Sequence, residues 1–209
     1  MLNELSSLIS TTMNDRSIAE GGLAYDISGL RLFRYQSTSS FTPATYRPHV
    51  CMVIQGSKDL SFQDREVQLR PGTAIVVSQD LSAISRVSDA TVDAPYLAAV
   101  MPIDMDRLRL VADRLNDLPQ RQTRERSLIT FQFDETFSHL LRRILVLAPQ
   151  SREAQLLAET YRDEFHALLL LSEAGADLTK LLTENSKANR VARAIAHIRK
   201  NLGAGSTIQ

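Results

Sequence analysis

The segment 47–78 constrains the fold of this chain more than any other part of the sequence. Residues 50–54 and 74–77 are short apolar runs rich in β-branched side chains and bounded by Gly and Pro, a pattern typical of strands covered on both faces. Between these runs, residues 60–69 alternate between apolar and polar side chains around a polar turn at 63–66, which predicts a hairpin. Four such strands in so short a segment predict a small antiparallel barrel or sandwich.

One helix and three further strands are expected around this segment. Residues 2–13 place Leu and Ile at helical spacing, which predicts a short amphipathic helix. Strands are predicted at 30–35, around 83–87 and at 95–100, the last of them closing a barrel near residue 102. Residues 14–29 and 36–45 are rich in Gly, Ser and Thr and are expected to be connections.

After residue 102 the apolar pattern changes from strand to helix spacing. Three amphipathic helices are predicted, with side chains that can cap their first turns supplied by Asp104, Asp134 and Ser151. Residues 119–130 are polar and basic and are expected to be a mobile loop. The run 168–171 is apolar on more faces than one partner covers, so pairing of helices in a homodimer and burial against the barrel both stay open.

Composition excludes several classes of protein. Lys plus Arg and Asp plus Glu both number 24, so no bulk charge attracts nucleic acid or an anionic membrane. The hydrophobic content of 44% is sufficient for a real core, and the single Cys excludes an internal disulfide. No apolar run approaches a membrane span of about 20 residues, and the amino terminus lacks the features of a secretory signal. We therefore expect a cytoplasmic globular protein.

Two sequence stretches resemble a known family. His-Val-Cys-Met-Val-Ile-Gln-Gly at 49–56, followed by Pro-Gly-Thr-Ala-Ile-Val-Val-Ser-Gln-Asp-Leu at 71–81, resembles the amino-terminal domain of AraC-type transcriptional regulators. This resemblance implies an α+β fold in which a small antiparallel cupin-like β-barrel is followed by an α-helical subdomain. It also implies that the barrel senses a small-molecule effector or mediates pairing, and that helix-turn-helix units bind DNA.

The last segment of the chain resembles another part of the same family. Residues 189–201, Asn-Arg-Val-Ala-Arg-Ala-Ile-Ala-His-Ile-Arg-Lys-Asn, are similar to the first helix of the AraC-type DNA-binding domain. Arg190, Arg193 and Lys200 lie on the face opposite the apolar stripe and are the candidate DNA contacts. Because the sequence stops at Gln209, before any recognition helix, we expect a chain truncated just inside the DNA-binding domain.

These patterns divide the chain into three parts. Residues 1–102 form the predicted cupin-like barrel with its N-terminal helix, residues 103–184 a helical subdomain for dimerisation or linkage, and residues 186–209 the start of a truncated helix-turn-helix domain. The expected partners are an unknown small-molecule effector, DNA through the missing domain, and a second copy in a homodimer, with no membrane.

Candidate effector-binding residues are barrel residues with a polar tip or a large ring: Arg34, Tyr46, His49, Cys51, Phe62 and Tyr96. Because the central strands are apolar throughout, alternation does not show which face points inward. His139 and His166 fall within helical patterns, which favours hydrogen-bonded histidines over catalytic bases.

Two other functions remain as alternatives. The first is a metal-dependent cupin enzyme, a dioxygenase or an isomerase. Such cupins place two His one residue apart, whereas here His49 is followed by Cys51 and Gln55 stands near the place of the acid. We therefore expect no metal, no cofactor and no catalytic residue. The second alternative is a barrel without ligand that only pairs two DNA-binding domains.

Overall fold

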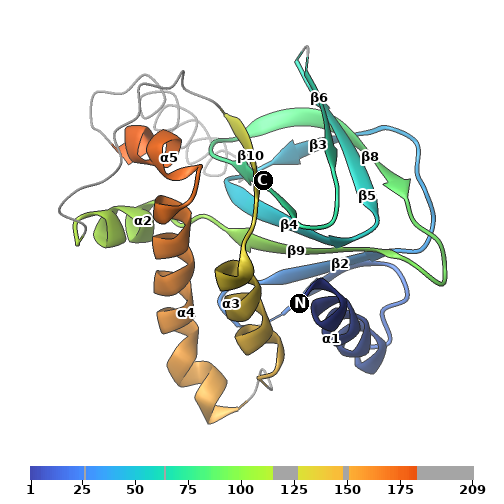
Figure 1. Cartoon of the computed structure of the whole chain (residues 1–209), viewed down its shortest axis with the longest axis horizontal. Helices are drawn as coiled ribbons and strands as arrows, with labels where there is room; N and C mark the ends of the chain where they lie inside the picture. The colour runs from blue at the N-terminus through green and yellow to red at the C-terminus, as the bar shows by residue number, and fades with distance from the viewer. Residues whose placement is uncertain (26, 64, 115–126, 148–150, 183–209) are drawn as a thin grey trace, which may run out of the picture.

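The computed structural model describes residues 1–25, 27–63, 65–114, 127–147 and 151–182. Five helices lie in these ranges: α1 (Leu2–Asp15), α2 (Met105–Ala112), α3 (Glu135–Leu145), α4 (Arg152–Leu171) and α5 (Gly175–Leu182). The same ranges hold ten strands: β1 (Gly21–Ala24), β2 (Arg31–Tyr35), β3 (Thr42–Tyr46), β4 (His49–Gln55), β5 (Ser57–Phe62), β6 (Arg65–Leu69), β7 (Thr73–Val77), β8 (Leu81–Asp89), β9 (Tyr96–Pro102) and β10 (Leu128–Gln132). Figure 1 shows the strands on one side of the molecule and α2, α4 and α5 on the other.

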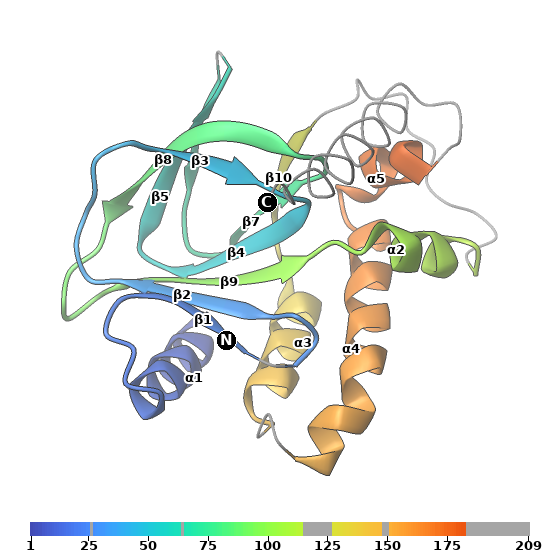
Figure 2. The same cartoon turned by 180° about the vertical axis from the view of Figure 1, so that it is seen from behind.

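The strands form two antiparallel sheets. The larger sheet has the order β1-β2-β9-β4-β7-β10 and the smaller sheet the order β3-β8-β5-β6. The α+β class is confirmed, with cupin-like antiparallel strands preceding most of the helices. The expected closed barrel is corrected, because the described strands divide into two sheets that face each other (Figure 2).

The two faces of the larger sheet serve different parts of the molecule. Side chains alternate between the faces of a strand, so neighbouring residues point in opposite directions. Leu32, Val50 and Val76 belong to the main hydrophobic core, which they share with the helices. Cys51 and Ile75, which are the sequence neighbours of Val50 and Val76, instead belong to a second cluster shared with the smaller sheet.

Three strands lie in segments expected to be connections. β1 falls within 14–29 and β3 lies within 36–45 except for its last residue, and each is an edge strand of its sheet. β10 lies partly within the expected loop 119–130 and pairs antiparallel with β7, from Leu128 opposite Val77 to Gln132 opposite Thr73. The chain therefore returns from α2 to the larger sheet before it forms α3.

The predicted helix caps are confirmed by their hydrogen bonds. The Asp104 side chain accepts from the backbone N–H groups of residues 106 and 107, and the Asp134 side chain accepts from those of residues 136 and 137. The Ser151 hydroxyl accepts from the N–H of residue 154. These caps satisfy donors that the first turn of a helix leaves without partners. The third predicted helix ends earlier than expected, at Leu171, and α5 follows it.

Helices cover the outer face of the larger sheet. α1 buries Leu5, Ile9 and Met13 completely against this face and against α3. α4 packs against α2, α3 and α5. His166 of α4 is buried and hydrogen-bonded as expected, whereas His139 of α3 is exposed.

Candidate functional site

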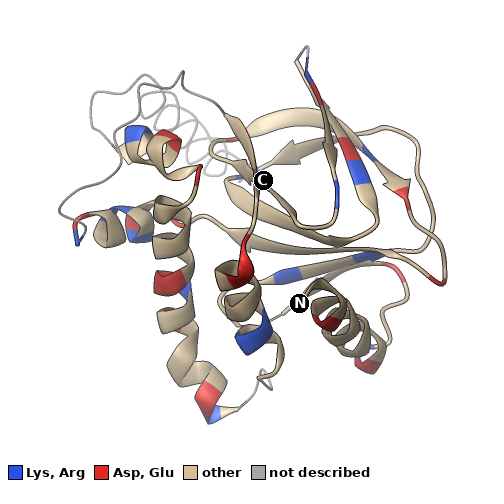
Figure 3. Cartoon of the chain, viewed as in Figure 1, with Lys and Arg blue, Asp and Glu red and all other residues tan. Residues whose placement is uncertain are grey.

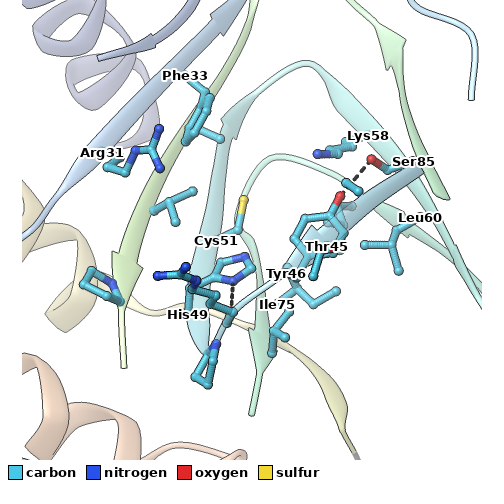
Figure 4. Close-up of a pocket in the computed structure, with 18 of the residues that line it drawn as sticks. Arg31, Phe33, Thr45, Tyr46, His49, Cys51, Lys58, Leu60, Ile75 and Ser85 are labelled. Atoms are coloured by element: carbon cyan, nitrogen blue, oxygen red, sulfur yellow. Dashed lines mark hydrogen bonds between the residues drawn. The ribbon is translucent and has the colours of Figure 1, made fainter. Parts of the chain in front are cut away.

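A cavity of about 690 Å³ lies between the two sheets. All eight strands from β2 to β9 supply residues to its wall, together with residues of the connection between β3 and β4. Figure 4 shows these side chains converging from both sheets. A volume of this size falls in the range of pockets that bind small molecules, about 300–1,000 Å³.

The interior of the cavity is largely apolar. Its buried wall comes from aliphatic side chains on four strands, namely Leu60, Leu69, Ile75, Val77 and Ala98. Four aromatic side chains complete it: Phe33, Tyr35, Tyr46 and Tyr96. A lining of this kind favours a ligand with a substantial apolar body.

Three cationic side chains line the same cavity. Arg31 and Arg47 are exposed, and Lys58 is half-buried. The Arg31 guanidinium lies 5.4 Å from the centre of the Phe33 ring, and Lys58 Nζ lies 5.7 Å from the centre of the Tyr46 ring. No Asp or Glu is among the lining residues, and within the described ranges none of these cations has a carboxylate partner. The site is therefore positively charged.

The side chains of Tyr46 and His49 are held in place at the wall of the cavity. The Tyr46 hydroxyl is hydrogen-bonded to Ser85 Oγ at 2.8 Å, and the His49 ring stacks on the Tyr46 ring with centroids 5.6 Å apart (Figure 4). His49 Nδ1 lies 2.7 Å from the carbonyl oxygen of Arg47. Burial, and to a lesser degree the nearby Lys58 charge, lower the pKa of His49 below its ordinary value.

Cys51 and Tyr96 form a buried, uncharged part of the wall. Burial raises the pKa of the Cys51 thiol and raises the pKa of the Tyr96 hydroxyl well above its ordinary value. Both groups therefore remain protonated near neutral pH. As a free cysteine inside a hydrophobic cluster, Cys51 behaves as a small apolar side chain with a weak donor.

Four of the six predicted effector-binding residues meet in this cavity: Tyr46, His49, Cys51 and Tyr96. Phe62 packs against the second hydrophobic cluster but is not among the lining residues. Arg34 lies on the opposite face of the larger sheet. Its Nε donates to the Ala19 carbonyl at 2.8 Å, its Nη1 to Asn14 Oδ1 at 2.7 Å, and its Nη2 to the Ile18 carbonyl.

Strand alternation explains where Arg34 points. It is two residues from Leu32 and so shares the helix-covered face, whereas Arg31 and Phe33 face the cavity. The sequence prediction missed Arg31, Arg47 and Lys58. Successive residues of β2 point to opposite faces of the sheet. Assigning Leu32 to the core would therefore have placed Arg31 on the face of the cavity. Arg190, Arg193 and Lys200 lie outside the described residues.

The described ranges hold neither a cluster of metal-binding side chains nor a membrane-spanning helix. No group of three or more His, Cys, Asp or Glu side chains there is arranged to bind a metal ion. No helix there is both long enough and apolar enough to cross a membrane. Gln55, which stands near the place of a metal-binding acid in the sequence, accepts a hydrogen bond from Ser6 Oγ at 2.7 Å and donates one to the Pro95 carbonyl at 2.9 Å.

Two antiparallel sheets thus face each other around a ligand-sized cavity, with helices on the outer face, in a cupin-like arrangement. The family model described as "AraC-type transcriptional regulator N-terminus" matches residues 26–177. The chain belongs to this family. A search of curated protein sequences gave no match.

Solved structures of ToxT from Vibrio cholerae have a similar fold. Unsaturated fatty acid-bound wild-type ToxT of strain SCE256 matches with a TM-score of 0.53 and 11% identity, over 79% of this chain and 62% of that chain. A second ToxT structure, in the P21 form, matches with a TM-score of 0.52 and 9% identity, over 80% of this chain and 64% of that chain. The chain thus spans less than two thirds of the length of these ToxT chains, and at such identities the likeness shows the fold alone.

Proposed function

We propose that this chain is the effector-sensing domain of an AraC-type transcriptional regulator and that its effector is an amphipathic organic anion bound between the sheets. The observation that carries the proposal is the pairing of an apolar cavity with Arg31, Arg47 and Lys58 and no lining carboxylate. The apolar wall accepts the body of the ligand, and the cations accept its acidic group.

The charge of the lining favours an anion over a neutral ligand. A half-buried cation without an acidic partner has lost part of its hydration without gaining an ion pair, and a bound anion restores that interaction. The ToxT structure with similar architecture carries an unsaturated fatty acid, which is one member of this chemical class. Membership of a family of transcriptional regulators favours this function over that of a metal-dependent cupin enzyme.

We also propose where the regulator pairs with a second copy and where it contacts DNA. A homodimer would use the helical part, where Leu156 and Leu171 of α4 are 78% and 66% exposed. DNA contacts would come from Arg190, Arg193 and Lys200 and from the helix-turn-helix units that the resemblance implies, with the regulator acting in the cytoplasm.

Calorimetric titration with palmitoleate, below its micelle concentration, tests the proposed ligand class. The matched neutral ligand is palmitoleate methyl ester, which keeps the apolar chain and lacks the charge. We expect the acid to bind about fivefold more tightly than the ester, because one charge interaction at a half-exposed site contributes about 1 kcal/mol. Lys58→Met should remove most of this preference and leave ester binding unchanged.

Arg65→Met is the matched control, since it removes a cation from an exposed position on β6 outside the cavity. It should bind both ligands as the wild type does. Absence of binding for acid and ester alike would refute the sensor proposal, and equal affinity for the two would refute its anionic part.

A further inference from the structure

His49 has one nitrogen that is engaged and one that is open. Nδ1 lies 2.7 Å from the Arg47 carbonyl oxygen, which can only accept, so Nδ1 carries the proton. Nε2 has no hydrogen-bond partner within the described residues. The ring itself is fixed by stacking on Tyr46 and stands among the cavity side chains in Figure 4.

This arrangement lets His49 gain a proton without losing a contact. In the neutral ring the lone pair is on Nε2, and protonation converts that atom into a second donor while the Nδ1 bond persists. His166 shows the opposite arrangement. Its Nε2 accepts the Asp104 backbone N–H at 2.9 Å, so a proton there would displace an existing hydrogen bond.

The groups that face His49 decide its charge when the cavity is empty. The surrounding side chains are Arg47 and Tyr46 beside it, Lys58 across from β5, Arg31 from β2, Cys51 on its own strand and Tyr96 from β9. The set contains cations and neutral groups but no carboxylate. Burial and the Lys58 ammonium therefore lower the pKa of His49, and the ring is neutral at pH 8.

We propose, resting on the function proposed above, that His49 binds the acidic group of the effector together with Lys58 and takes up a proton as it does so. An anion placed between the two side chains offsets the repulsion that Lys58 exerts on a charged imidazole. The protonated Nε2 then donates a charge-assisted hydrogen bond to the same anion. His49 is thus a residue that selects anions and couples their binding to pH.

The sign of the pH dependence follows from proton linkage. The complex holds a proton that free protein lacks at pH 8, so the affinity for an anion rises as pH falls toward 5.5. A gain of about tenfold corresponds to a rise of about one unit in the pKa of His49 on binding. Guanidinium and ammonium groups keep their charge over this range and phenols stay neutral, so a ligand without charge should bind equally at both pH values.

The test uses 1-anilinonaphthalene-8-sulfonate, whose sulfonate stays ionised at both pH values. N-phenyl-1-naphthylamine, with the same rings and no sulfonate, is its neutral counterpart. Dissociation constants are measured by fluorescence at pH 5.5 and pH 8.0, and only the signal displaced by palmitoleate is counted. We expect the sulfonate to bind about tenfold more tightly at pH 5.5, His49→Gln to abolish this difference, and His139→Gln, at an exposed histidine of α3, to retain it.

A measurement on the wild type alone guards against misfolding of the variant. Calorimetric titration of the sulfonate at pH 7 in buffers of different ionisation enthalpy should show net proton uptake. Equal sulfonate affinity at both pH values, or a difference that persists in folded His49→Gln, would overturn the role of His49 and leave the sensor proposal standing. No displaceable binding of either probe at either pH would overturn both.

Discussion

At the scale of single residues, His166 is a buried histidine that the fold keeps neutral. It is 1% exposed, its Nε2 accepts the Asp104 N–H, and its Nδ1 donates to the Arg162 carbonyl at 2.7 Å. Burial is the main cause that lowers the pKa of His166 below its ordinary value of 6.5. Because Asp104 begins α2 and His166 lies in α4, this one ring joins the end of the sheet to the helices.

The lowered pKa of His166 predicts how stability depends on pH. Above pH 6.5 the ring is neutral in folded and unfolded chains, so its full contribution is present. As pH falls from 6.5 toward the lowered folded value, the unfolded chain binds the proton first, and the free energy of unfolding decreases. Urea unfolding between pH 7.5 and 5 measures this slope.

His166→Gln should lower the free energy of unfolding by about 1–2 kcal/mol at pH 7.5, because Gln can replace only one of the two hydrogen bonds. It should also flatten the slope between pH 6.5 and 5, while the exposed His139→Gln control keeps the wild-type slope. An unchanged slope in His166→Gln would show that another group governs the acid response.

Arg34 and Lys58 show why the site could be predicted only in part. Tyr46, His49, Cys51 and Tyr96 were predicted because each has a polar tip or a large ring, and all four line the cavity. Lys58 was not among the predicted residues, and its position on a half-buried strand points it into the cavity. Arg34 was chosen for its polar tip. It lies two residues from the core residue Leu32, and this spacing shows that it faces the helices.

At the scale of elements, Gly56 makes the passage from the larger to the smaller sheet. It joins β4 to β5 with a φ of +69°, beside an irregularity in the pairing of β4 with β9 between Val53 and Gln55. A Cβ at this position would lie 2.5 Å from the Asp89 carbonyl oxygen and 2.9 Å from Tyr96 Cα. The turn therefore needs glycine both for its backbone conformation and for the space around it.

Gly56→Ala should lower the free energy of unfolding by far more than the cost of placing alanine at a positive φ. Gly21 supplies the matched control, since its φ is +99° and a Cβ there would meet nothing within 4 Å. We expect Gly21→Ala to cost about 1 kcal/mol and Gly56→Ala about 3 kcal/mol or more, measured by urea unfolding. Equal costs would mean that the contacts with Asp89 and Tyr96 relax freely.

The sequence prediction missed the short edge strands β1, β3 and β10. The caps at Asp104, Asp134 and Ser151 were predictable because a capping side chain bonds within its own first turn. β10 carries only Ile129 and Phe131 as buried apolar residues and follows a polar, basic segment. Its pairing with β7 depends on a partner about fifty residues away in sequence, which local pattern does not reveal.

At the scale of the whole molecule, one hydrophobic core runs through sheet and helices. It extends from Leu5 of α1 through Val50 and Val76 of the larger sheet to Phe165 of α4 and Leu178 of α5. The change from strand to helix spacing after residue 102 made the α+β class predictable. The same change also suggested a domain boundary at residue 102. In the described structure the hydrophobic core extends across this residue.

A continuous core predicts that sheet and helices unfold together. Leu5 in α1 and Phe165 in α4 are both 0% exposed, and truncating either to Ala should cost about 2–5 kcal/mol. If sheet and helices form one cooperative unit, a loss of stability in one lowers the free energy of unfolding of both. Either variant should then weaken hydrogen-exchange protection by the same free energy in peptides from β4 and from α4. Leu110→Ala, at an exposed position of α2, should change neither. If Phe165→Ala instead weakens protection in α4 and leaves β4 at its wild-type value, the helices form a separate unit. An effector in the cavity would then act on them through the short passages from β9 into α2 and from β10 into α3, rather than through the whole shared core.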